Sequence, residues 1–224
     1  MKEIFSGEIY EVLPLNDGIL FSYHKDTIDE NVLVAYKMVN FDTGRFTDVA
    51  KNIYLVTKFG NNYKAIINNC DNYITVKAIL LPNGKVFLLS ADGTAQLLDT
   101  DATPIWKGDM IYRKSTPSDI VLYNNSLWVC YPESNALVRY NLATMREELR
   151  IGGVNSPFDK PRSMFLEGNC VTVSNQESGK LIKVNLDTYA VEELETFEEP
   201  LYQYVKSGSN RFAVLESGLY YLMV

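Results

Sequence analysis

Residues 126–153 read SLWVCYPESNALVRYNLATMREELRIGG, and they set a pattern that recurs along the chain. An alternating apolar strand is followed by a polar turn, a second alternating strand, an Asn-Leu-Ala-Thr turn and a third strand. The stretch from Asn169, NCVTVSNQESGKLIKVNLDTYAVEELETF, repeats this order. A third copy, KVFLLSADGTAQLLDTDATPIWKGD, begins at Lys85. Copies spaced by about 40 residues are typical of a repeat protein built from small β-sheets.

One more short apolar strand precedes each copy, so that each unit has four strands. These strands begin at Ile74, Ser118 and Pro161. The segments from Ile9 and from Leu201 fit the same template, with the last one ending at Val224 after only three strands. We therefore predict an all-β fold, a β-propeller with five blades of four antiparallel strands, forming a single domain over residues 1–224.

The two ends of the chain complement each other. KEIFSG, residues 2–7, is a spare strand before the first unit, and the last unit lacks one strand. We expect the N-terminal strand to pair with the C-terminal blade and close the ring, because an open edge would expose unpaired backbone groups.

An insertion separates the first two units. Residues 53–72, IYLVTKFGNNYKAIINNCDN, have two apolar runs around Gly60, which predicts a β-hairpin serving as half a blade or a lid. The stretch from Leu142, LATMREELR, has helical charge spacing, but its place in the repeat predicts a strand.

The segment FDKPRSMFLEGNCVTVSNQESGKLIKVNLDTYAVEEL, residues 158–194, resembles a repeat of the YVTN and NHL class of β-propellers. The resemblance is strongest over residues 117–197. It implies a scaffold whose members mostly bind proteins or ligands, with some enzymes among them. Such propellers commonly have six or seven blades, so a chain of five units departs from the family pattern. Fold alone does not imply function.

Charge and cysteine content narrow the class of protein. A net charge of -7 disfavours nucleic acid and anionic membrane surfaces as partners. The N-terminal residues lack the apolar run of a signal peptide, and no apolar stretch is long enough for a membrane span. Cys70, Cys130 and Cys170 have no metal-type spacing and cannot all pair, which favours a reducing cytoplasm.

Signatures of catalysis are scarce. His24 is the single histidine, and no phosphate-binding loop, nucleophile elbow or dinucleotide fingerprint occurs. We therefore expect no cofactor and no metal, and a non-catalytic protein.

Polar residues recur where the innermost strands of a propeller would converge. Aligned on the repeat, these positions are Tyr10-Glu11, Lys77-Ala78, Ser118-Asp119, Arg162-Ser163 and Gln203-Tyr204. We predict that Glu11, Lys77, Asp119, Arg162 and Tyr204 bind a ligand at the axial mouth. The same polar residues could instead merely line a wet channel.

The sequence favours a binding or scaffold protein that engages a protein partner or a small polar ligand at this mouth. The alternative is a carbohydrate-active propeller. A glycoside hydrolase would use a pair of carboxyl groups, for which Glu11 and Asp119 are the candidates if burial raises a pKa. A lectin-like protein would bind sugar through tyrosines without turnover.

Overall fold

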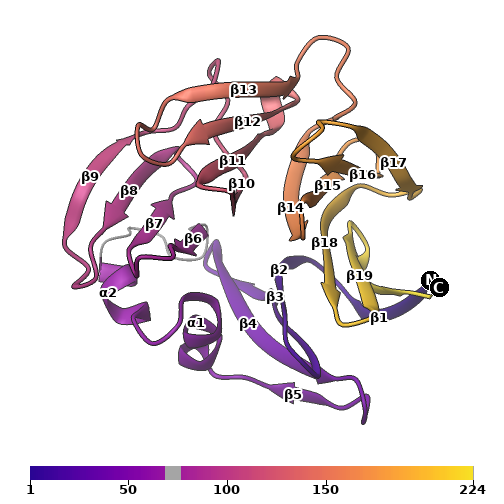
Figure 1. Cartoon of the computed structure of the whole chain (residues 1–224). Coiled ribbons are helices and arrows are strands. Elements are labelled where there is room, and N and C mark those ends of the chain that lie inside the picture. Colours follow the sequence, from indigo (N-terminus) through magenta and orange to yellow (C-terminus); the bar gives the residue numbers. More distant parts are fainter. Residues whose placement is uncertain (69–76, 224) are drawn as a thin grey trace.

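The computed structural model describes residues 1–68 and 77–223. Within these residues the chain forms five antiparallel sheets of four strands each. The sheets stand around a central axis as the blades of a ring (Figure 1). The predicted five-bladed β-propeller is therefore confirmed.

Each blade runs from an innermost strand at the axis to an outermost strand at the periphery. Blade 1 consists of β2 (Ile9–Pro14), β3 (Gly18–Ile28), β4 (Asn31–Asn40) and β5 (Phe46–Asp48). Blade 2 consists of β6 (Lys77–Leu80), β7 (Val86–Leu89), β8 (Thr94–Leu98) and β9 (Pro104–Asp109). Blade 3 consists of β10 (Asp119–Tyr123), β11 (Ser126–Tyr131), β12 (Ala136–Asn141) and β13 (Glu147–Gly152), with a 3-10 turn at Pro132–Ser134.

Blades 4 and 5 complete the ring. Blade 4 consists of β14 (Pro161–Glu167), β15 (Cys170–Asn175), β16 (Lys180–Asn185) and β17 (Val191–Thr196). Blade 5 consists of β18 (Leu201–Ser207), β19 (Asn210–Leu215), β20 (Gly218–Leu222) and the N-terminal strand β1 (Lys2–Ser6). The segment from Leu142 is a turn followed by β13, as predicted.

The N-terminal strand closes the ring. β1 pairs antiparallel with β20, from Lys2 opposite Tyr221 to Ser6 opposite Gly218. The two chain ends consequently lie side by side (Figure 1). This confirms the expectation that the spare strand completes the last blade and covers its edge.

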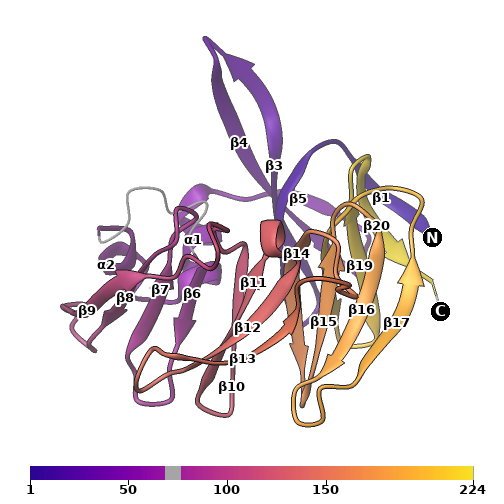
Figure 2. The same ribbon diagram turned by 90° about the horizontal axis from the view of Figure 1, so that it is seen from above.

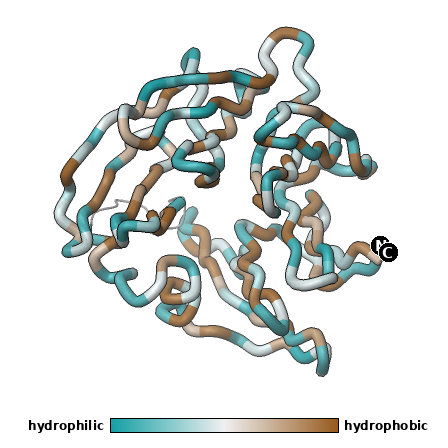
Figure 3. The backbone as a smooth tube through the Cα atoms, viewed as in Figure 1, coloured by the Kyte–Doolittle hydropathy of each residue, from teal (hydrophilic) through white to brown (hydrophobic). Residues whose placement is uncertain are grey.

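The hydrophobic core lies between neighbouring blades. Apolar stretches follow the strands, and polar stretches are frequent at the turns (Figure 3). Between blades 3 and 4, for example, the fully buried Trp128 and Leu137 belong to one cluster with Met164 and Val171. Side chains that alternate along each strand therefore serve two contacts, one with each neighbouring blade.

The predicted hairpin at residues 53–72 is wrong over its described part. Residues 51–68 form two helices, α1 (Lys51–Phe59) and α2 (Tyr63–Asn68), and residues 69–72 lie outside the described residues. Gly60, with a φ of 72°, does not turn a hairpin but ends α1, and its N–H donates to the Val56 carbonyl. The buried side chains Tyr54, Leu55 and Phe59 then lie on one face of the helix.

Blade 1 carries a long ribbon. β3 and β4 are 11 and 10 residues long, and their tip rises above the ring beside the axis (Figure 2). At its tip, Ile28, Val32 and Leu33 are exposed. The base of the ribbon meets the axial mouth, where His24 Nδ1 donates a hydrogen bond at 3.1 Å to a carboxylate oxygen of Glu8.

Candidate functional site

The innermost strands present two layers of side chains to the axis. In blades 1, 4 and 5 a β-bulge lies one residue into the innermost strand, and the extra residues are Tyr10, Arg162 and Tyr202. All of them line the mouth of the ring. A bulge bends its strand and redirects a side chain. The repeated bulge thus places an equivalent residue of these blades at the rim of the mouth.

In blades 1, 4 and 5, the residue after the bulged residue belongs to a second layer, which we call the floor. Its members are Glu11, Lys77, Asp119, Ser163 and Gln203, one from each blade. Each floor residue pairs with a residue near the end of the second strand of its own blade. Asp119, for example, pairs with Cys130, and Ser163 pairs with Ser174. This shared register shows that the floor is a true layer of the repeat.

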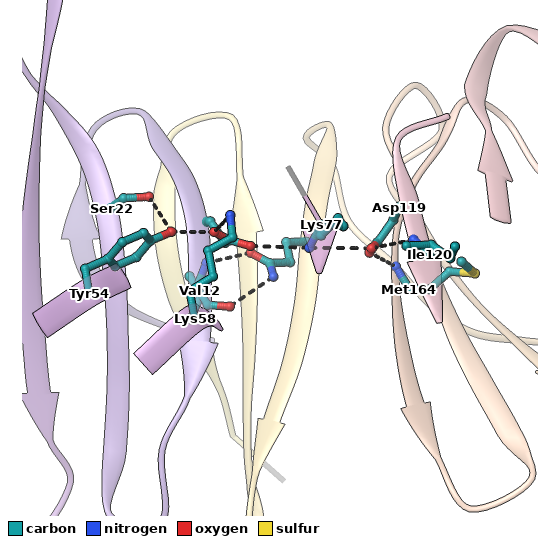
Figure 4. Close-up of polar contacts among 10 residues, drawn as sticks. Val12, Ser22, Tyr54, Lys58, Lys77, Asp119, Ile120 and Met164 are labelled. Carbon is teal, nitrogen blue, oxygen red and sulfur yellow. Dashed lines mark hydrogen bonds and ion pairs between the residues drawn. The ribbon is translucent and has the colours of Figure 1, made fainter. Parts of the chain in front are cut away.

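An ion cluster links three blades across the floor (Figure 4). Lys77 Nζ lies 3.3 Å from Glu11 Oε1 and 3.5 Å from Asp119 Oδ1. Glu11 and Asp119 are buried, whereas the Lys77 side chain is 32% exposed. One ammonium group on blade 2 therefore joins the carboxylates of blades 1 and 3.

Helix α1 contributes two further groups to this cluster. Lys58 Nζ lies 2.7 Å from Glu11 Oε2, and the Tyr54 hydroxyl donates to the same oxygen. The Tyr54 oxygen also lies 3.4 Å from Ser22 Oγ on β3 (Figure 4). Lys58 and Tyr54 were not among the predicted site residues, because a hairpin would not have carried them to the axis.

The charges around Glu11 determine its protonation. Burial alone would raise the pKa of Glu11, but the Lys77 and Lys58 charges and the hydrogen bonds from Lys58 and Tyr54 outweigh it and lower this pKa to about 2. For Lys77, burial opposes the ammonium charge, yet Asp119 and Glu11 raise its pKa. Glu11 and Lys77 are thus both charged near neutral pH. The glycoside hydrolase alternative required burial to raise the pKa of Glu11, whereas this pKa is lowered.

Asp119 and Gln203 use their side chains to cover the inner edge of the next blade. Asp119 accepts hydrogen bonds from the backbone N–H of Met164 at 2.8 Å and of Ile120 at 2.7 Å. Gln203 accepts from the Val12 N–H at 2.7 Å and donates to the Val12 carbonyl at 3.0 Å. The innermost strands have no neighbouring strand on the axial side, so these side chains satisfy their free backbone groups.

Two hollows are lined by residues of the floor. The mouth is a cavity of about 790 Å³ lined by residues of all five blades, and a smaller hollow of about 230 Å³ is lined by residues of blades 1 to 4 and by Lys58 of α1. Glu11, Lys58, Lys77 and Asp119 line both. The ion cluster therefore borders both hollows.

The structure brings Glu11, Lys77 and Asp119 together and places Arg162 in the same mouth, but it places Tyr204 elsewhere. Tyr204 is buried between blades 4 and 5, with its ring 6.0 Å from that of Phe165. The alignment slipped by one residue in blade 5 because it matched Phe212, the third residue of β19, to Leu127 and Val171, which are the second residues of β11 and β15. The register instead places Gln203 in the floor. A slip of one residue moves a side chain to the opposite face of a strand.

Metal-ligand clusters and membrane helices were sought among the described residues. There, no group of three or more His, Cys, Asp and Glu side chains could hold a metal ion. Neither α1 nor α2, nor any other described helix, has the length and apolar character needed to cross a membrane.

No family model and no curated protein matches this chain. Solved structures do resemble it. Streptogramin B lyase aligns with a TM-score of 0.51 and 11% identity, covering 98% of this chain and 70% of that one. Sqt1 of Saccharomyces cerevisiae aligns with a TM-score of 0.53 and 11% identity, covering 97% of this chain and 73% of that one.

The computationally designed protein Ika8 aligns with a TM-score of 0.50 and 12% identity. The match covers 92% of this chain but only 55% of the designed one, so this chain spans about half the length of that protein. At such identities the likeness concerns the fold alone. Together with the ring of five four-stranded sheets, these comparisons identify the chain as a five-bladed β-propeller.

Proposed function

We propose that this protein is a non-catalytic binding protein that holds a protein partner or a small polar ligand in its axial mouth. The observation that supports this most is the mouth, whose volume of about 790 Å³ is lined by the innermost strands of all five blades. Converging strands allow residues far apart in the sequence to contact one ligand at the same time. A cavity of this size suits a small molecule or a short segment of a protein.

The charge state of the floor supports binding over catalysis. A glycoside hydrolase needs a carboxylic acid that keeps its proton near neutral pH. Glu11 has a pKa of about 2, and Lys77 contacts both candidate carboxylates. These groups suit a fixed, charge-balanced surface better than proton transfer, so the glycoside hydrolase alternative has less support.

Two finer parts of the proposal rest on the sequence. We infer that residues 117–197 are repeats of the YVTN or NHL type, on the strength of the motifs in residues 158–194. A cytoplasmic location is proposed from the cysteine content.

A pair of matched variants tests the use of the mouth. Ala91 is exposed and lines the mouth, whereas Ala143 is exposed in the turn after β12 and is not among the residues that line it. Tryptophan at position 91 should fill part of the cavity without disturbing the core. We expect Ala91→Trp to lose ligands or partners that the wild type and Ala143→Trp both retain.

The measurement combines two readouts. Small polar molecules (amino acids, hydroxy acids, amides and monosaccharides) are titrated into ¹⁵N-labelled protein, and partner proteins are compared by pull-down with the three forms. Binding that survives Ala91→Trp, and is lost instead on changes in residues 192–199 or in the ribbon tip, would contradict the proposal.

A further inference from the structure

The floor is joined from blade to blade except at one place. Blades 1, 2 and 3 are linked by the ion cluster, and Asp119 and Gln203 bind the backbone of the following blade at Met164 and Val12. In each of these two bonds, the acceptor side chain is a floor residue and its backbone partner is the residue after the next floor position. The same relation between blades 4 and 5 would join Ser163 to Tyr204.

Ser163 does not make this connection. Its side chain is too short to act as Asp119 or Gln203 does, and its Oγ has no hydrogen-bond partner among the described residues. Ser163 is only 7% exposed, and it lines the mouth. A buried hydroxyl without a hydrogen-bond partner is destabilising, so a hydrogen bond from Ser163 to a polar atom of a bound molecule would be favourable.

The residue before Ser163 carries a cation with no carboxylate partner among the described residues, and both residues line the mouth. Arg162, the bulged residue of blade 4, is exposed in the mouth and has no hydrogen bond or ion pair with the described part of the chain. The other cations that line the mouth contact acids: Lys58 with Glu11, Lys77 with Glu11 and Asp119, and Lys160 with Glu177. Among the described cations that line the mouth, Arg162 is therefore the one available to bind an anion from outside the protein.

We propose that a carboxylate group binds at the blade 4 side of the mouth, accepting hydrogen bonds from the Arg162 guanidinium and the Ser163 hydroxyl. The inference rests on the proposed use of the mouth and specifies the ligand. A carboxylate fits because it accepts several hydrogen bonds at once and pairs well with arginine. Glu8, Glu133 and Glu216 line the same mouth, so a ligand with a single carboxylate is favoured over a polyanion.

The carboxylate can come from a small acid or from a protein. N-acetylglycine represents a free or chain-terminal carboxylate, and the capped peptide acetyl-Ala-Asp-Ala-amide represents an acidic side chain. N-acetylglycinamide and acetyl-Ala-Asn-Ala-amide are the matching uncharged controls of similar shape, which we call their neutral twins. Each compound is titrated into ¹⁵N-labelled protein, and the dissociation constant is taken from the shifts of amide signals around the mouth.

We expect at least one acid to bind more tightly than its neutral twin, and the preferred acid identifies the source. Loss of a charge-assisted hydrogen bond should weaken binding about 10-fold or more in Arg162→Gln. Ser163→Ala should weaken it by a smaller factor, and Arg162→Lys should fall between Arg162→Gln and the wild type. Lys160→Gln removes a charge from the same mouth and should change affinity little, since Lys160 is paired.

Three results would overturn the carboxylate site. The first is equal binding of the acids and their neutral twins. The second is an Arg162→Gln variant that binds the acids like the wild type. The third is a loss of affinity in Lys160→Gln as large as that in Arg162→Gln. If in addition the mouth binds a neutral sugar or an amine and Ala91→Trp removes that binding, the proposed use of the mouth stands without the carboxylate site. If no compound of either panel binds and no pull-down partner depends on Ala91, both proposals fail.

Discussion

The contact between blades 1 and 2 differs in kind from the contact between blades 3 and 4. Blades 3 and 4 pack directly, with Trp128 of one and Met164 of the other in a single apolar cluster. Between blades 1 and 2, side chains of α1 and α2 lie in the cluster that contains Leu20 of blade 1 and Leu88 of blade 2. The helices occupy a sector of the ring between these blades (Figure 1).

This difference extends to the axis. The directly packed pair is joined by Asp119, whose carboxylate accepts a backbone hydrogen bond from the next blade. The helix-filled pair is joined by side-chain charges, since Lys58 of α1 and Lys77 of β6 both contact Glu11. An inserted segment can thus replace direct blade packing when it supplies both apolar surface and a charged group for the centre.

The largest effect is expected at the directly packed contact. Trp128 is 1% exposed, and Trp128→Ala should lower the free energy of unfolding by about 3–5 kcal/mol by leaving a large cavity. Urea unfolding followed by circular dichroism measures this loss. Trp106, only partly buried on the outermost strand of blade 2, is the control, and Trp106→Ala should cost clearly less. Equal losses would show that the buried contact between blades 3 and 4 contributes no more to stability than the partly buried Trp106 on the periphery of blade 2.

The charged contact predicts an acid-sensitive stability. Because the folded protein lowers the pKa of Glu11 from 4.5 to about 2, this carboxylate stabilises the fold above about pH 4.5 and loses that effect as the pH falls toward 2. The shift corresponds to about 3 kcal/mol. Glu11→Gln should therefore be less stable at pH 7 and should lose less stability than the wild type over this pH range.

The control for this prediction is an exposed acid. Glu193 also has a lowered pKa, through hydrogen bonds from Lys180 and Thr196, but it lies on the outer strand of blade 4. Glu193→Gln should change the acid unfolding curve little, because surface ion pairs contribute little. A Glu11→Gln curve that parallels the wild type would contradict the role given to the buried cluster.

A smaller and more local effect is expected at the helices. Leu55 is 5% exposed in α1, and Leu55→Ala should cost about 2–3 kcal/mol. Hydrogen exchange should accelerate mainly in α1 and α2, while the amides of β11 and β15 keep their protection. Uniform acceleration throughout the ring would mean that the helices and the blades unfold as one unit.

The repeat made the blades predictable, and the insertion limited what could be predicted of the site. Strand alternation and spacing indicated five blades and the closing strand, and they placed Glu11, Lys77 and Asp119 on converging strands. Tyr204 was misplaced because the second position of β19 is the polar Arg211, so an alignment of apolar residues chose Phe212, one residue further along. A shift of one residue exchanges the two faces of a strand. Lys58 and Tyr54 were missed because the helix that carries them depends on packing against blades 1 and 2.

The central claim is that the floor of the mouth is a fixed, charge-balanced surface that supports binding. The most direct measurement is the pKa of the Glu11 carboxyl, followed by its ¹³C chemical shift in a pH titration, with Glu11→Gln used to assign the signal. We predict a pKa of about 2, with the carboxylate charged throughout the neutral range. A pKa above its ordinary value of 4.5 would contradict the account, because Glu11 could then hold and transfer a proton in the mouth.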